Sequence, residues 1–182
     1  MSSKADTVRR KDRQETDESF LHLLLENSAS CTVAANTDDH PFIHATFFVY
    51  DKERDEINFH FSKYGFGGQV IRNDTKVSIS IYQTGKLYTA PKAVDFGSEY
   101  QSVVIYGKIR IVEDDAERMS AMKMFFNKFF SLIPKSVYND VMPTEINPVH
   151  VVKVKIEKWF GKQHRVPETA LSSFYPKVKS TL

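Results

Sequence analysis

The chain has 182 residues, with 25 Lys and Arg, 23 Asp and Glu, and a formal net charge of +2. This length suits one domain with its own core, and the near balance of charges argues against a protein built chiefly to bind nucleic acid. The single cysteine, Cys31, excludes an internal disulfide, and no stretch approaches the ~18 apolar residues of a membrane span, so we expect a cytoplasmic protein without a membrane partner.

The two ends of the chain differ in character from its middle. Residues 1–15 are polar and charged, which predicts a flexible N-terminal arm. Residues 166–182 lose periodicity, so we expect a C-terminal tail, and the folded domain then spans 16–165. This domain begins with an amphipathic helix that follows Thr16 as its N-cap and ends near Asn27.

After this helix the periodicity changes to that of strands. Alternating or continuous apolar residues predict three antiparallel strands in succession, over 31–35, 42–50 and 57–61. The other face of the middle strand mixes aromatic and polar side chains, including His44 and Thr46, and we expect both faces to be covered. Its apolar face consists of Ile43, Ala45, Phe47 and Val49.

The spacing of two histidines bears on metal binding. His40 and His44 are four positions apart, which on a strand separates them by roughly 13 Å. Two side chains at that distance do not share one ion, so we expect no metal site here.

The stretch from Ile57 to Asn73 joins a strand to a glycine-rich turn and then to a short helix. Lys63 follows the strand, and the glycines of the turn allow the first amides of the helix to approach an anion closely. This pattern is typical of a phosphate site. The alternative interpretation is a flexible connection with a solvated lysine.

Three later segments complete the predicted sheet. Residues 76–82 alternate as a fourth strand, and the stretch 83–99 has little periodicity and predicts a long loop that could cover a ligand. A long strand follows over 101–112, in which Gly107 predicts a bulge of the kind found where a sheet closes into a barrel. The last strand runs from 149 to about 159.

A helix is predicted between these last two strands, within residues 113–130. Acidic residues stand at its start, as the helix dipole favours. Its stripe of large side chains indicates packing in the core or against another subunit, in preference to a cofactor-binding motif. These side chains are Met119, Met122, Phe126 and Phe129.

Five motifs in this order carry a resemblance to a known family. They are RRKDR at 9–13, HPFIHATFFVYD at 40–51, INFHFSKYG at 57–65, YQSVVIYGKIRIVED at 100–114 and IEKWFGK at 156–162. Together they resemble the FMN-binding split-barrel superfamily, and within it the pyridoxamine 5'-phosphate oxidase-like proteins related to nitroimidazole resistance. The resemblance covers roughly residues 8 to 165.

The resemblance implies a mainly β (α+β) fold, a six- to seven-stranded antiparallel split β-barrel with flanking helices. It also implies a homodimer that holds FMN at the subunit interface. The positions that match the family's cofactor contacts are Ile43, His44, Thr46, His60, Phe61, Ser62, Lys63, Gly67, Gln101, Ser102, Trp159 and Arg165.

Two departures from the family pattern affect these expectations. The related proteins usually carry a lysine or arginine where this chain has Gly67, so one cationic phosphate contact is missing, for which Lys63, Arg72 or backbone amides could compensate. Beyond Arg165 the family's second substrate-phosphate arginine is absent. We therefore do not expect oxidation of pyridoxamine phosphate itself.

The function implied is an FMN-dependent oxidoreductase that reduces a small acceptor, such as a nitro compound or a quinone, with electrons from NAD(P)H. The candidate proton donors are His44 and His60. One alternative is a non-catalytic split barrel that carries flavin, or that binds haem through one of the histidines at 44, 60, 150 and 164. Another is a barrel that has lost its cofactor, for which Gly67 is the main argument.

Overall fold

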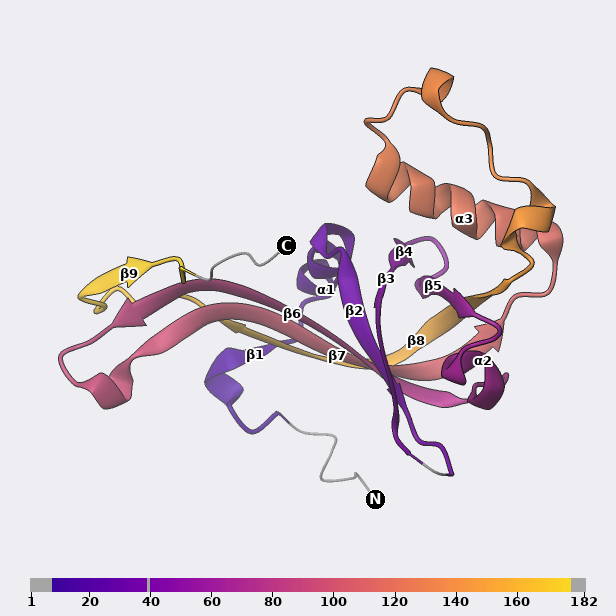
Figure 1. Cartoon of the computed structure of the whole chain (residues 1–182). Coiled ribbons are helices and arrows are strands. Elements are labelled where there is room, and N and C mark those ends of the chain that lie inside the picture. The colour runs from indigo at the N-terminus through magenta and orange to yellow at the C-terminus, as the bar shows by residue number, and fades with distance from the viewer. Residues whose placement is uncertain (1–7, 39, 178–182) are drawn as a thin grey trace.

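The computed structural model describes residues 8–38 and 40–177 (Figure 1). The α-helices are α1 (Glu18–Asn27), α2 (Phe66–Val70) and α3 (Asp115–Phe130), and short 3-10 helices cover Lys11–Arg13, Ala93–Asp95, Lys135–Val137 and Pro143–Ile146. The strands are β1 (Gln14–Glu15), β2 (Ser30–Ala35), β3 (Phe42–Phe47), β4 (Val49–Asp51), β5 (Glu56–Ser62), β6 (Lys76–Thr89), β7 (Gly97–Ile111), β8 (Val149–His164) and β9 (Ser172–Phe174). Among the described residues, no helix combines the length and the apolar character needed to cross a membrane.

The sheet is closed into a barrel at Phe48. Its strands follow the order β3-β2-β6-β7-β8-β5-β4, and neighbours are antiparallel. Only Phe48 separates β3 from β4 in the sequence, although these strands are the two ends of the order. The sheet must therefore curl until its edges meet, and Phe48 is fully buried where they do. The predicted antiparallel barrel is confirmed, and so are the antiparallel pairings of the first three predicted strands. The middle one, over 42–50, is however divided at Phe48 into β3, which pairs with β2, and β4, which pairs with β5.

The interior of the barrel is filled by alternate residues of the long strands. Val33, Ile79, Ile105 and Val154 are completely buried, and burying each such side chain contributes about 1.5–3 kcal/mol. Helix α1 adds its own apolar stripe to the same core. Its N-cap is Asp17, whose side chain accepts a hydrogen bond from the Ser19 amide at 2.9 Å, and not Thr16 as predicted.

Strand β3 leaves one apolar face uncovered. Its inward face carries the buried ring of Phe42, whereas Ile43 is 69% exposed and Phe47 is 55% exposed. We predicted that both faces would be covered. Within a single chain, the outward face remains open to contact with another molecule.

The stretch predicted as a long loop over 83–99 is instead a projecting hairpin. Strand β6 continues to Thr89 and β7 already begins at Gly97, with a register shift between Thr84 and Leu87. The pairing consists of backbone hydrogen bonds, so it persists where side chains no longer alternate. We call residues 83–100 together with β9 the arm, and Figure 1 shows it extending far to one side of the barrel.

Both terminal segments take part in the sheet. Residues 1–7 of the predicted flexible arm lie outside the described residues, but Val8 is buried and β1 pairs with β8, so the prediction is wrong for 8–15. In the predicted tail, β9 pairs with β6, and residues 178–182 lie outside the described part. Strand β8 also continues to His164, beyond its predicted end near Trp159.

The predicted bulge at Gly107 is confirmed. The register of β7 against β8 shifts between Tyr106 and Gly107. A Cβ atom at Gly107 would lie 2.3 Å from the backbone oxygen of Lys155. Only glycine allows the two strands to approach this closely, which fixes where the sheet bends.

Candidate functional site

The end of β5 and the start of α2 bring polar groups together, as the sequence predicted. The Ser62 hydroxyl is exposed and accepts a hydrogen bond from the Tyr64 amide at 3.2 Å, while the half-buried Lys63 donates its own amide to the Pro148 oxygen at 2.9 Å. A Cβ atom at Gly68 would lie 2.1 Å from the Lys63 oxygen, so glycine is required for α2 to sit this close to the strand. The first amides of α2, which lack partners within the helix, therefore lie beside Lys63.

The space beside Gly67 is filled by the ring of Phe42. A Cβ atom at position 67 would lie 3.0 Å from Phe42 Cε2, 3.2 Å from Phe42 Cζ and 3.3 Å from Phe61 Cδ2. The aromatic rings thus occupy the space into which a longer side chain would extend. The lysine or arginine that the family resemblance implies at this position would fit only if Phe42 moved.

Arg72 does not take the place of that missing cation. Its guanidinium donates hydrogen bonds to the backbone oxygens of Ile71 at 2.8 Å and Gly68 at 3.4 Å, and also to the oxygen of Gln69. These contacts satisfy carbonyl groups at the C-terminal end of α2. Of the two side chains considered for compensation, Lys63 remains.

Next to α2 lies a group of rings that we call the His-aromatic cluster, formed by Phe42, His44, Phe61, Phe66 and His150. The His44 ring is 6.0 Å from Phe42 and 6.1 Å from Phe61, and Phe61 is 5.7 Å from His150. The Nε2 atom of His44 is buried and has no hydrogen-bond partner among the described residues. Leaving such an atom unpaired costs about 1–3 kcal/mol, which marks His44 as a group in need of a partner.

His150 lies near several cationic side chains, among them Lys63. Burial lowers the pKa of His150, and the nearby charges of Lys63, Arg72 and Arg118 lower it further. Both effects disfavour the charged imidazole, and the Arg72 guanidinium is already bonded to backbone oxygens, so Lys63 is the cation that we consider for an anion at this end of the barrel.

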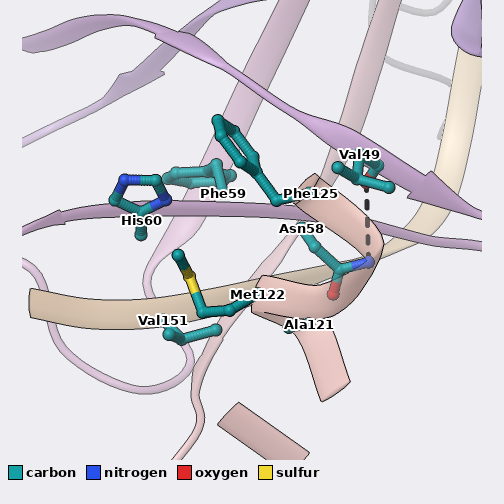
Figure 2. A pocket seen from close by; sticks show the side chains of 8 residues that line it. All are labelled: Val49, Asn58, Phe59, His60, Ala121, Met122, Phe125 and Val151. Atoms are coloured by element: carbon teal, nitrogen blue, oxygen red, sulfur yellow. Dashed lines mark hydrogen bonds between the residues drawn. The ribbon is translucent and has the colours of Figure 1, made fainter. Parts of the chain in front are cut away.

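The His60 side chain packs against α3, on the face of β5 opposite to that of Phe61 (Figure 2). Its ring stands edge-on to Phe125 with centroids 5.3 Å apart, and it lines a cavity of about 10 Å³ together with Asn58 and Met122. Burial, and then the neighbouring His44, lower the pKa of His60. A cavity of this size holds at most one water molecule, so the structure places His60 in a closed layer and not in an open cofactor site.

The other predicted residues of this end differ in exposure. Ile43 is exposed, Thr46 is half-buried with its hydroxyl hydrogen-bonded to the Phe47 oxygen at 3.1 Å, and Phe61 belongs to the core. Their common location on β3 and β5 agrees with the prediction, but only Ile43 presents a side chain to the outside.

A second group of predicted residues lies where the arm leaves the barrel. There a pocket of about 250 Å³ is lined by Gln83, Thr84, Gly85, Glu99, Tyr100, Gln101, Gln163, His164 and Arg165. The Gln101 amide donates to Gln163 Oε1 at 2.8 Å, and the Gln163 amide donates to Glu15 Oε1 at 3.2 Å. We call this the arm-base pocket, and two of the predicted cofactor contacts, Gln101 and Arg165, line it. Trp159, by contrast, packs against the core. Ser102 follows Gln101 on β7, so its side chain lies on the opposite face of the strand, and it does not line this pocket.

Aromatic residues around this pocket were missed by the sequence analysis. The Tyr88 hydroxyl is 2.8 Å from His164 Nε2, and the Arg13 guanidinium lies 5.8 Å from the Tyr100 ring centre. Tyr82 and Tyr100 also stand 5.8 Å apart. Burial, and then Arg13, lower the pKa of His164. Tyr88 was missed because its segment was predicted to be a loop. Arg13 was missed because residues 1–15 were predicted to be flexible, although Arg13 belongs to a motif that carried the family resemblance.

The two groups are separated along β8. Ser62 pairs with Val149 at the first residue of this strand, and Gln101 pairs with Gln163 near its last. Fourteen positions at ~3.3 Å per residue correspond to roughly 45 Å of strand. Figure 1 shows α2 and the arm at opposite ends of the sheet. A single chain therefore does not bring the predicted cofactor residues into one site.

Comparison with known families gives one match. The family model described as pyridoxamine 5'-phosphate oxidase matches residues 17–163. A search of curated proteins finds no match.

Solved structures with the same fold include several from bacteria. The flavocytochrome Anf3 from Azotobacter vinelandii has a TM-score of 0.79 at 20% identity, over 94% of this chain and 77% of that one. The FAD and haem binding protein from Mycobacterium smegmatis has a TM-score of 0.73 at 18% identity, over 83% and 73% of the two chains. A candidate 5-nitroimidazole antibiotic resistance protein from Bacteroides thetaiotaomicron has a TM-score of 0.67 at 19% identity, over 82% and 86%. At these identities the likeness shows the fold.

Proposed function

Since the chain belongs to the pyridoxamine 5'-phosphate oxidase family, we propose that it is a flavin-binding oxidoreductase that holds FMN between two copies of itself. Its substrate is a small acceptor, such as a nitro compound or a quinone, and its electrons come from NAD(P)H. A cytoplasmic setting accords with the buried free thiol of Cys31.

The observation that carries this proposal is the separation of the two residue groups. Lys63 and the first amides of α2 lie at one end of β8, and the arm-base pocket lies at the other. One flavin contacts both groups only if a second copy supplies one of them. In a symmetric dimer, two such sites arise from the same contact.

The open face of β3 supports the presence of a second copy. Ile43 and Phe47 are exposed apolar side chains on a strand whose other side belongs to the core. Apolar faces of this kind are characteristic of surfaces covered by a partner. The projecting arm adds further exposed apolar residues, among them Val94, Phe96 and Phe174.

The residues present fit a flavin nucleotide. Lys63 and the α2 amides offer donors to a phosphate, and the rings and amides of the arm-base pocket offer contacts to a polar aromatic ring. When bound, the flavin supplies the electron transfer, while the chain binds and orients it. Within the described residues, His44 Nε2 is the buried polar atom of this end that still lacks a partner, and we assign it to hydrogen bonding with ligand or substrate after a small shift of its ring.

A haem-binding function is the second candidate, and His44 is the observation that favours it. Two proteins of the same fold are described as a flavocytochrome and as an FAD and haem binding protein. An unpaired imidazole nitrogen is suited to ligate iron. Addition of haem would then give a Soret band that the His44→Ala variant lacks.

The proposed flavin function is tested by an absorption spectrum of the protein with and without added FMN. We expect flavin absorbance to remain with the protein after desalting, and the Lys63→Ala variant to retain less than the Lys92→Ala variant, whose lysine is exposed near the tip of the arm. A protein that stays colourless, or equal retention by the two variants, contradicts the proposal.

A further inference from the structure

We propose that a groove on the outer face of α3 binds an apolar carboxylate, such as a medium-chain fatty acid. The groove lies between α3 and the segment 131–142 and has a volume of about 640 Å³, within the ~300–1,000 Å³ typical of small-molecule sites. It shares no lining residue with the arm-base pocket. The inference is independent of the flavin proposal.

Helix α3 is apolar on two opposite faces. On one face Ala121 is buried and Phe125 meets His60 on the sheet. On the other face Met119 and Phe126 line the groove. A helix that is apolar on both sides is normally covered on both, but the sheet covers only one side of α3.

The segment after α3 forms a roof over the second face, and Figure 1 shows it arching back along the helix. Tyr138 stacks on Phe126 with ring centres 6.3 Å apart and an angle of 13° between the rings. Lys135 is paired with Asp140 and also lies 4.8 Å from the Tyr138 ring centre. A slender molecule can enter such a roofed groove, whereas a flat protein surface would have to displace the segment.

The charges at the groove select a single negative group. Its charged residues are Lys123, Lys135 and Asp140. Since Lys135 is paired with Asp140, the balance is one positive charge, on Lys123, which has no ion-pair partner in the described part of the chain. The methionines of the floor adapt readily to a flexible apolar chain. An alkyl chain ending in a carboxylate matches both features.

Titration with decanoate, below its micelle-forming concentration, tests this inference in protein labelled at the methionine methyl groups. In the NMR spectrum we expect the Met119 and Met122 methyls to shift, and the Met124 methyl, which does not line the groove, to stay in place. Lys123→Glu should weaken the affinity roughly tenfold, as loss of a charge-assisted contact implies. Lys92→Glu, with the same change of charge at an exposed lysine of the hairpin, should leave it unchanged.

Two further comparisons, one of ligands and one of variants, make the result decisive. Decyltrimethylammonium has the same chain with the opposite charge, and should bind more weakly than decanoate. Ser120→Trp fills the groove from an exposed position and should abolish the shifts without lowering the melting temperature. The inference is overturned if decanoate causes no shift, if the two ligands bind equally, if Lys123→Glu behaves as Lys92→Glu does, or if Met119 shifts with protein concentration alone, which would assign the groove to a second copy.

Discussion

Gly67 and Phe42 are complementary in shape: a Cβ atom on the glycine would lie 3.0 Å from the phenylalanine ring. The family resemblance leads us to expect a basic residue at this position, and the Phe42 ring occupies the space that its side chain would need. The phosphate end of the site is consequently left with Lys63 as its cation.

Gly67→Lys is expected to lower the free energy of unfolding by about 1–3 kcal/mol, because the new side chain overpacks against Phe42. Urea denaturation measures the change. The matched control is Gly65→Lys, since a Cβ atom at Gly65 meets nothing closer than 3.9 Å. Equal destabilisation by the two variants would show that the Phe42 contact is not the cause.

Glu117 ties α3 to the sheet through a charged cluster and should make stability sensitive to acid. Its Oε1 atom lies 2.6 Å from Arg110 and 2.8 Å from Lys153, which is only 4% exposed. Hydrogen bonds from these two residues lower the pKa of Glu117 from 4.5 to about 2. Because the folded-state pKa is the lower one, the stabilisation is complete above pH 4.5 and is lost as the pH falls toward 2.

The Glu117→Gln variant should therefore be less stable than the wild type at pH 7, with a difference that narrows between pH 4.5 and pH 2. Thermal unfolding across this range measures it. Glu113→Gln, at an exposed position two residues before α3, serves as control. A difference that is independent of pH would refute the role of the Glu117 carboxylate.

Lys128 should also make stability depend on pH, in an alkaline range. Its ammonium donates to the backbone oxygens of Ser28 at 2.7 Å, Phe48 at 3.2 Å and Leu25 at 3.4 Å, which joins α3 to α1 and to the barrel closure. Burial lowers the pKa of Lys128 from 10.5 to about 8. Between these values the unfolded chain binds a proton that the folded chain does not, so stability rises with pH in that window.

Lys128→Met is accordingly expected to destabilise the protein by about 1–3 kcal/mol at pH 7, because three carbonyl groups lose a donor. The deficit relative to the wild type should grow between pH 8 and pH 10.5. Lys123→Met provides a control on the outer side of the same helix. A constant deficit over this range would mean that Lys128 titrates normally.

Ile43→Glu tests the open face of β3. The side chain is 69% exposed in the single chain, so the substitution should leave the fold intact, as seen by circular dichroism, while it converts a dimer into monomers. Light scattering after size-exclusion chromatography reports the mass. Leu132→Glu changes a residue that is 94% exposed on the segment after α3 and should keep the dimer. The same mass for Ile43→Glu and the wild type would rule out this face as the contact.

The sequence predicted those parts of the fold that depend on a few neighbouring residues. The alternation of residues 76–82 predicted the first half of β6, Gly107 predicted the bulge, and the acidic residues near Asp114 predicted the start of α3. The inward face of β3 could not be found in this way, since it depends on how the sheet closes at Phe48.

The site shows the same division. Lys63 and the glycines were found from their order in the sequence. The hydrogen bonds of Arg72 depend on how the chain turns at the end of α2, and the position of His60 depends on its tertiary contact with α3. The arm was missed because backbone pairing does not require alternating side chains, and Tyr88 was missed with it. Arg13 was missed because the polar N-terminal segment predicted no fixed structure, whereas its guanidinium reaches the Tyr100 hydroxyl.

The most direct measurement of the central claim, a flavin site shared by two copies, is flavin content in a mixed dimer of Lys63→Glu and Arg165→Glu chains. Each variant alone damages both sites of its own dimer. In the mixed dimer one site combines the unaltered Lys63 of one chain with the unaltered Arg165 of the other, so flavin absorbance should return for one site per dimer. If the mixed dimer binds no more FMN than either variant alone, the shared site does not exist.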